Sequence, residues 1–474
     1  MSLTAALNNS ANSLTVLQQA LDVIQNNVTN SSTPGYAAQK LNITAQPFDV
    51  ASGAAGGIAA QGLISSRDSY ADSEVQRQLQ VLGGFTAQAQ GTSALQSLFD
   101  VTGTSGVPAA LNNLYTAFSA WSASPTDASA EQNVISAAGS FANAVSQLSQ
   151  ALQSQAKGLN SQIGSTVGQI NSLAGQIRQY NQTKLQNPDP NPGADASLEN
   201  TLEQLSQLTN FTALSQPDGT VTVLVGGGSP LVIGNQQYSI SAQAQVDNNP
   251  PAGNPQSTPT SQILDDQGND ITASVTGGQL GGLLDVRNRV LTSIIGDSQQ
   301  SGSLNQFAKT FADTVNNILT SGTTSTATGA PAGLPLFTYN NGDATFSAGT
   351  LAVNPAITPA QLAPVDASGN ANGNANQLAS LATASSQTGG QSFVSFFSGI
   401  AAGAGQENAT AQSNATLQHQ VVSQTQSQRD QISGVSLDAQ AAALLEFQRA
   451  YQSVARVLTV INSLADSILA IVQQ

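Results

Sequence analysis

The sequence predicts a mainly α-helical chain with an inserted β domain, an α+β fold. Apolar residues recur every seven positions at both ends of the chain, which is typical of coiled-coil helices. Most of the interior shows apolar steps of three and four, and residues 211–275 change to a period of two. We therefore expect terminal N- and C-helices forming a coiled-coil domain, then a helical-bundle domain, then a small β-rich outer domain.

The first element is a helix that carries an apolar seam. Its apolar residues fall in two rows whose steps alternate four and three, the 3.5-residue repeat of a left-handed coiled coil. Roughly 28 residues at 1.5 Å each span about 40 Å. We expect the following residues to form the assembly surface of this helix: Leu3, Leu7, Leu14, Leu17, Leu21, Ile24 and Val28.

The helix runs into NNVTNSSTPGYAAQK, which predicts a joint. Asparagines satisfy helix-end carbonyls or accept left-handed backbone. Pro34 disfavours helix at Thr33, and Gly35 permits a sharp turn. We expect Tyr36 to pack the following segment against the terminal helix or a neighbouring subunit. The turn motif comprises Asn26, Asn27, Asn30, Thr33, Pro34, Gly35 and Tyr36.

The middle of the chain alternates between helical and strand-like patterns. Residues 70–205 are mostly helical in pattern, with a Pro-rich surface loop at 187–197. Strands are indicated at TVTVLVGG and LVIGNQQYSISAQAQV, and short strands at LFTYN, ATFSA and TLAV. Helix is expected at 283–319 and again at 376–429, with an Ala/Gly-rich break near Ala401.

The last helix mirrors the first. Ser436 can cap it, and Asp438 lies in the first turn, where negative charge is favourable. Its expected assembly residues are Leu437, Leu444, Phe447, Tyr451, Val454, Leu458, Ile461, Ile468 and Val472. A flanking row of Val457, Leu464 and Ile471 widens the stripe beyond one seam, which indicates more than one packing partner. The alternative is that the terminal helices form only one pair inside a single bundle.

Because only the chain ends carry matching heptads, we expect a nested domain order. Residues 1–65 and 432–474 would form the terminal coiled-coil assembly domain, and 66–208 with 280–431 the helical middle domain. Residues 209–279 would form the inserted outer domain.

Composition excludes several classes of function. Charged residues are only 8% of the 474 residues, and 12 basic against 27 acidic residues give a net charge of −15, which disfavours nucleic acid as a partner. The chain has no cysteine and a single histidine, His419, which we expect at the surface, so we predict no catalytic, metal or cofactor site. We expect neither a cleaved signal peptide nor a membrane-spanning helix.

Three motifs resemble calcium-binding or phosphate-binding loops, but each lacks a required residue or the required spacing. NPDPNPGAD has no bidentate Glu at the last position of a calcium loop, and DDQGND has the wrong spacing and predicts a hairpin turn. GTVTVLVGGGSPL lacks the Lys of a phosphate loop.

The terminal segments resemble the rod–hook–hook-associated family of bacterial flagellar axial proteins. In that family a long N-terminal helix ends in an Asn-rich turn followed by Thr-x-Gly-Tyr/Phe, which Asn26 to Tyr36 match. Ala455 and Val457 continue a Q-x-A-Y-x-x-x-A-x-V pattern that begins at Gln448. The segment SGVSLD is similar to that of the family's hook–filament junction members; its matching residues are Ser433, Gly434, Val435, Leu437 and Asp438. This chain departs from the family pattern at three places: Ala38 stands where a basic residue is common, Gln440 where a second acidic residue is common, and Leu464 to Asp466 where an acidic-Met pair is usual.

The resemblance implies a structural, non-enzymatic subunit that joins hook to filament in the extracellular flagellum. It implies self-assembly into a ring or helix, and contact with the hook protein and a second junction protein. It also implies a flagellar export chaperone and type III export apparatus as partners. The alternatives are the hook protein or another axial subunit, a surface-exposed adhesin, and a cell-wall hydrolase, for which the sequence supplies no paired carboxylates.

Overall fold

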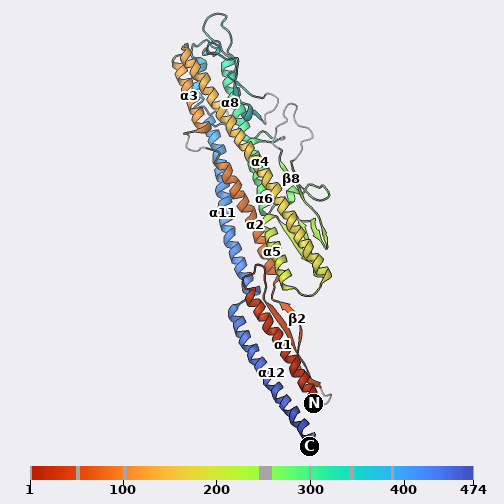
Figure 1. Cartoon of the computed structure of the whole chain (residues 1–474). Coiled ribbons are helices and arrows are strands. Elements are labelled where there is room, and N and C mark those ends of the chain that lie inside the picture. Colours follow the sequence, from red (N-terminus) through yellow and green to blue (C-terminus); the bar gives the residue numbers. More distant parts are fainter. Residues whose placement is uncertain are drawn as a thin grey trace.

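The chain forms a long stack of helices with both termini at one end (Figure 1). The computed structural model describes residues 3–49, 54–99, 104–244, 259–297, 300–340, 346–385 and 389–472. The main helices are α1 (Leu3–Thr29), α2 (Ser69–Gln96), α3 (Gly106–Ala123), α4 (Ala128–Gln186), α5 (Pro192–Leu208), α6 (Gly278–Asp285), α7 (Thr292–Ile295), α8 (Ser303–Thr320), α9 (Ser347–Thr350), α10 (Gly373–Ser380), α11 (Phe393–Ser433) and α12 (Leu437–Val472). A π-helical turn (Val286–Leu291) joins α6 to α7.

At the end that holds the termini, α1 lies between α12 and a β-hairpin (Figure 1). The hairpin consists of β1 (Gln39–Asp49) and β2 (Ala54–Ser65), which pair antiparallel with a bulge between Leu41 and Ile43. It was not predicted from the sequence. We call α1, the hairpin and α12 the terminal unit, and the rest of the chain the body.

The body is built on α4, a helix of 59 residues that packs against α3, α5 and α6. Beside it, α2 packs along α11 over much of their length (Figure 1). Large aromatic side chains fill the end of the body far from the termini; Phe141, Phe311 and Phe393 are each fully buried there. Burying such side chains stabilises the body by about 1.5–3 kcal/mol each.

Small antiparallel sheets lie against the helices. Four strands form one sheet in the order β3 (Phe211–Ser215), β4 (Val221–Val225), β5 (Ser229–Ile233), β6 (Gln236–Gln237). Two-stranded sheets are formed by β7 (Ser241–Ala244) with β8 (Ser261–Leu264), and by β9 (Phe337–Thr338) with β10 (Ala352–Val353). The buried apolar side chains of β4 and β5 belong to the same continuous core as the helices. The fold is thus mainly α with an inserted β part, as predicted, while the domain boundaries stay a prediction.

Asparagines on the helices fasten the strands. Asn181 of α4 donates to the carbonyl of Val221 (2.8 Å) and accepts from the amide of the same residue (2.8 Å). Asn316 of α8 makes the same pair of bonds with Phe337, at 2.9 Å each. A side-chain amide offers one donor and one acceptor in the geometry of a peptide, so it takes the place of a neighbouring strand.

Several details of the predicted secondary structure are wrong. Helix α11 runs unbroken through Ala401, because its small residues Ala401 and Ala404 are buried in the core. The helical segment predicted at 283–319 is interrupted instead, at Gly296, which has a φ of +77°. The described part of ATFSA begins helix α9 rather than a strand. Most of the predicted loop NNPPAGNPQSTPT and the side chain of Val472 lie outside the described residues.

Candidate functional site

The end of α1 is fastened by the buried side chain of Asn27. Its Oδ1 accepts from the backbone amide of Gln39 (2.9 Å), and its Nδ2 donates to the carbonyl of the same residue (2.8 Å). The same Nδ2 also donates to Oε1 of Gln440 (3.1 Å). One side chain that is 1% exposed therefore joins α1, the start of β1 and the first turns of α12.

The Asn-rich segment after α1 folds into the sharp turn that the sequence predicts. The amide of Tyr36 donates to the carbonyl of Thr33 (3.1 Å), and Gly35 has a φ of +74°. Proline at the second position and a left-handed glycine at the third are typical of a type II turn. The hydroxyl of Tyr36 lies 3.0 Å from Oδ1 of Asn27 and 3.2 Å from Oδ1 of Asn26, so the turn folds back onto the end of α1.

Asn30 and Thr33 complete the cap of α1. The amide of Asn30 donates to the carbonyl of Asn26 (2.9 Å), and its side chain donates to that carbonyl as well (3.0 Å). Thr33 Oγ1 lies 3.1 Å from Oδ1 of Asn30. The polar residues of the turn thus satisfy helix-end groups, as their type predicts.

The turn is seated on α5, which belongs to the body. A Cβ added to Gly35 would lie 2.4 Å from the carbonyl oxygen of Ala196 and 3.0 Å from the amide of Asn200. Any side chain at this position would collide with the backbone of α5. Glycine is therefore required here both by the left-handed φ and by the close approach.

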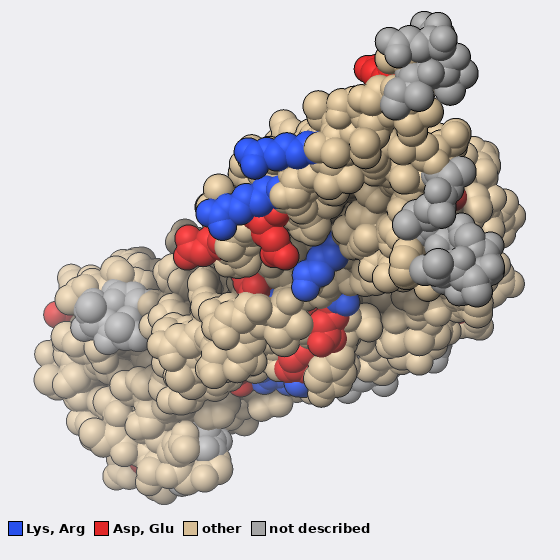
Figure 2. Space-filling view, turned by 90° about the horizontal axis from the view of Figure 1, so that it is seen from below, with Lys and Arg blue, Asp and Glu red and all other residues tan. Residues whose placement is uncertain are grey.

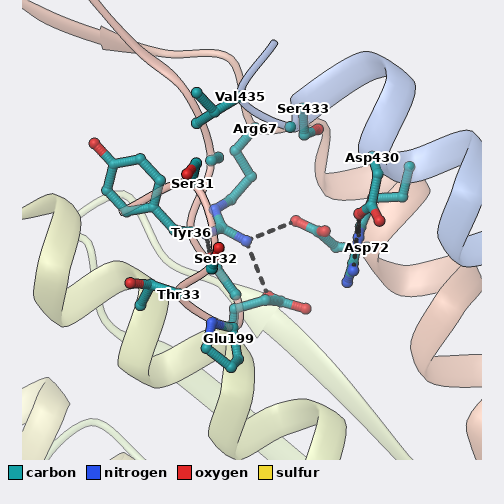
Figure 3. Close-up of a pocket in the computed structure, with 15 residues that line it drawn as sticks. Ser31, Ser32, Thr33, Tyr36, Arg67, Asp72, Glu199, Asp430, Ser433 and Val435 are labelled. Atoms are coloured by element: carbon teal, nitrogen blue, oxygen red, sulfur yellow. Dashed lines mark hydrogen bonds and ion pairs between the residues drawn. The ribbon is translucent and has the colours of Figure 1, made fainter. Parts of the chain in front are cut away.

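Arg67 ties this turn to the body (Figure 3). One guanidinium nitrogen donates to Asp72 Oδ2 (2.9 Å) and lies 3.5 Å from Glu199 Oε2, and the other donates to the carbonyl of Gly35. Glu199 Oε1 accepts from Gln76 Nε2 (2.8 Å). Arg67 precedes α2, Asp72 lies in the first turn of α2 and Glu199 lies on α5, so three segments meet at one cation.

Ser433, at the end of α11, closes the joint from the other side. Its carbonyl accepts from the amide of Ala38 (2.9 Å), and its hydroxyl accepts from the amide of Asp68 (3.1 Å). The amide of Ser66 donates to the carbonyl of Ala38 (2.8 Å). The chain crosses between the terminal unit and the body twice, at 65–68 and at 433–436. Hydrogen bonds hold both crossings in place.

The charges of the joint are unevenly balanced. Burial, with a smaller contribution from the nearby Asp72, raises the pKa of Glu199 to about 7. Burial also raises the pKa of Asp72, although Arg67 acts in the opposite direction. The next cation, Arg429, already pairs with Glu203 and with Asp430, at 3.1 Å from the latter. Two buried carboxylates thus share one guanidinium.

A pocket of about 290 Å³ lies beside these groups, lined by Ser31, Thr33, Tyr36, Arg67, Glu199 and Arg429 among others. In the view from below, charged side chains gather in a band across the middle of the face, and the surface on either side is almost free of them (Figure 2). This concentration stands out in a chain with only 8% charged residues.

The apolar rows of the two terminal helices divide between a covered and an uncovered face. In α1, Leu17 and Ile24 are buried, Leu3, Leu7, Leu14 and Leu21 are half-buried, and Val28 is exposed. In α12 the half-buried row consists of Leu444, Phe447, Tyr451, Val454, Leu458 and Ile461. We call Val457, Val460, Leu464 and Ile468 the outer row of α12; they are 52%, 58%, 51% and 52% exposed.

The remaining residues predicted from the family motif take different positions. Ser436 caps α12, since its Oγ accepts from the amide of Ala439 (3.3 Å). Gly434 approaches the carbonyl of Asp430, where a Cβ would lie at 2.3 Å, and Val435 lines the pocket. Leu437, Asp438 and Gln448 are exposed, as is His419.

Sequence reasoning missed the residues that complete the joint. Arg67 and Glu199 belong to no motif, and Gln39 and Gln440 bind Asn27 from segments 12 and 413 positions away. The one sequence feature that pointed to one of these residues of the joint was Gln440, which departs from the family pattern. Among the described residues no group of three or more His, Cys, Asp or Glu could hold a metal ion, and no helix is long and apolar enough to span a membrane.

Two family models match this chain, and solved structures match it as well. The model of the flagellar hook-associated protein FlgK helical domain matches residues 92–337, just over half of the chain. The model of the flagellar basal body rod FlgEFG protein C-terminal region matches residues 426–471, which cover all but the last residue of α12. The solved flagellar hook junction protein FlgK from Burkholderia pseudomallei has the same fold, with a TM-score of 0.64 at 17% identity over 77% of this chain and 100% of that one. No curated protein sequence matches the chain.

Proposed function

Because the chain belongs to the family of the flagellar hook-associated protein FlgK, we propose that it is a structural subunit that joins hook to filament in the bacterial flagellum. In this proposal it assembles with copies of itself through the terminal unit. The joint holds the terminal helices at a defined angle to the body, and the subunit has no enzymatic role.

The observation that carries the assembly role is the outer row of α12. Four large apolar side chains, each more than half exposed, follow one another at steps of three and four along one flank of the helix. Exposed apolar rows of this kind mark protein contact surfaces. Since α1 covers the neighbouring stripe of α12, the outer row is left for a neighbouring subunit.

The low charge of the surface supports permanent contacts of this kind. Only 8% of residues are charged, and neutral amides and hydroxyls cost less to bury than ions. The proposed neighbours are further copies of the chain, the hook protein on one side and a second junction protein on the other. Before assembly the chain would be carried by an export chaperone to the type III export apparatus and reach the cell exterior.

The position of the protein in isolated flagella tests this proposal. A label on the described, exposed His419 of the body is expected as one thin band at the boundary between hook and filament. A signal along the whole hook would instead identify a hook protein. Label outside the flagellum would contradict an axial role altogether.

A further inference from the structure

The joint contains more buried negative charge than its single shared cation can balance. Asp72 and Glu199 are 4% and 7% exposed, and both face Arg67. Burying a carboxylate is unfavourable unless it is paired, and one guanidinium cannot pair fully with two. Protonation of one of these two carboxylates removes the unpaired buried charge.

Glu199 is the carboxyl group that takes this proton. It lies 3.5 Å from the guanidinium of Arg67, whereas Asp72 lies at 2.9 Å and holds the closer ion pair. Its other oxygen accepts from the neutral amide of Gln76, a contact that survives protonation. The raised pKa of Glu199 agrees with this assignment.

Glu199 also lies on the helix face that seats the turn. Ala196, Glu199 and Asn200 are three and four positions apart on α5, so they share one face of the helix. Gly35 is wedged against Ala196 and Asn200, and its carbonyl accepts from the same Arg67 that Glu199 faces. A charge change at Glu199 therefore acts directly on the contact that fixes the terminal unit.

We propose that the joint is a proton-sensitive latch. With Glu199 protonated, Arg67 forms an ion pair with Asp72 and donates a hydrogen bond to the carbonyl of Gly35, and the turn stays seated on α5. With Glu199 ionised, it repels Asp72 and competes for Arg67, the adjoining pocket admits water between them, and the turn lifts. The terminal unit then swings about the two chain crossings at 65–68 and 433–436. This device belongs to the single chain and goes beyond the proposed function.

The direction of the effect follows from linkage. Glu199 holds its proton more tightly in the seated joint than in the opened one. The resulting stabilisation is fully present below the ordinary glutamate range and is lost as pH rises through about 7. The other charged or titratable groups that face this cluster are Tyr36, Arg67, Asp68, Asp72, Tyr180, Glu203, Arg429 and Asp430.

Hydrogen exchange in the full-length monomer at pH 6 and pH 8.5, corrected for intrinsic rates, tests the latch. The reporters are the amides of Ala38 and Gln39, which donate to Ser433 and Asn27 across the joint. Their opening constant is expected to rise about tenfold between the two pH values. The amide of Val221, held by Asn181 in the body, is expected to stay unchanged.

Glu199→Gln mimics the protonated state and is expected to abolish the tenfold change. The matched control is Glu407→Gln, which removes a carboxylate paired with Arg289 on the body and is expected to keep it. The proposal is overturned if wild-type Ala38 and Gln39 show no pH dependence. It is equally overturned if Val221 opens with them, or if a folded Glu199→Gln chain responds like the wild type.

Discussion

Asn27 and Gln39 bind each other as two adjacent strands would. The side-chain amide of Asn27 both donates to and accepts from the backbone of Gln39, at 2.8 and 2.9 Å, with the asparagine 1% exposed. This pair decides where α1 stops and where β1 starts. It also explains why a buried polar residue stands in the last turn of an amphipathic helix.

Replacing Asn27 by alanine leaves the amide and the carbonyl of Gln39 buried without partners. Each orphaned group costs about 1–3 kcal/mol, so we expect the terminal unit to lose about 2–6 kcal/mol. Native-state hydrogen exchange of the amides in the last turns of α1 measures this loss. Asn12→Ala, at an exposed position of α1, is the control and is expected to cause no loss. Equal protection in both variants would remove Asn27 from the joint.

Replacing Gly35 by alanine tests the seat on α5. Alanine is strained by about 1–2 kcal/mol at a left-handed backbone position, and here its Cβ would also meet the carbonyl of Ala196 at 2.4 Å. Gly329→Ala is matched in backbone, with a φ of +79° against +74°, but nothing lies within 4 Å of its Cβ. We expect Gly35→Ala to cost at least about 1 kcal/mol more in denaturant unfolding. Equal costs would show that the turn is not wedged.

How far the sequence predicts this architecture depends on how local each feature is. Local sequence determines the heptads of α1 and α12 and the Pro-Gly turn. The structure contains both helices and the turn at the predicted positions. The hairpin was missed because AAGGIAAQGLIS is dominated by alanine and glycine, which are depleted in strands, and lacks the alternation of a typical strand. It forms on the surface of α1, where Gly57 packs closely against Asn9.

The latch could not be predicted because its residues come from segments far apart. Arg67, Glu199 and Ser433 lie in unrelated stretches that only the fold brings together. Single-sequence reasoning also placed a break at Ala401, since Ala/Gly-rich stretches weaken helices in isolation. Packing of α11 against α2 overrides that preference, which is a tertiary effect.

The pair of Glu407 with Arg289 is expected to respond to pH in the opposite direction from Glu199. Hydrogen bonds from Arg289 lower the pKa of Glu407, so its stabilisation is present above the ordinary glutamate range and is lost as pH falls through the lowered value. Since both side chains are about half exposed, Glu407→Gln is expected to cost less than about 1 kcal/mol at pH 7.

Thermal unfolding at pH 7 and pH 3 measures this difference between Glu407→Gln and the wild type. The difference is expected to be smaller at pH 3 than at pH 7. The control is Glu446→Gln, an exposed carboxylate without an ion pair in the described part of the chain, which is expected to change little at either pH. A cost for Glu407→Gln that grows in acid would contradict the assignment.

The two rows of α12 are expected to respond differently to charge in the monomer. Ile461→Asp places a carboxylate in the half-buried stripe that α1 covers. It is expected to speed exchange of the α12 amides at least about tenfold, because removing a charge even partly from water costs more than about 1 kcal/mol. Leu464→Asp changes a side chain that is 51% exposed and is expected to leave exchange nearly unaltered. Neither change is expected to alter unfolding of the body. A large loss with Leu464→Asp would mean that the outer row already has a partner within the chain.

The most direct test of the assembly role is the state of the flagella in cells whose only copy of this protein carries Leu464→Asp. Electron microscopy of these cells is compared with cells carrying Asn462→Asp, which places the same charge on the opposite, exposed flank of α12. We predict hooks without filaments for Leu464→Asp, although the monomer folds normally, and intact filaments for Asn462→Asp. Normal filaments on the Leu464→Asp cells would contradict the central claim that the outer row of α12 binds the neighbouring subunit.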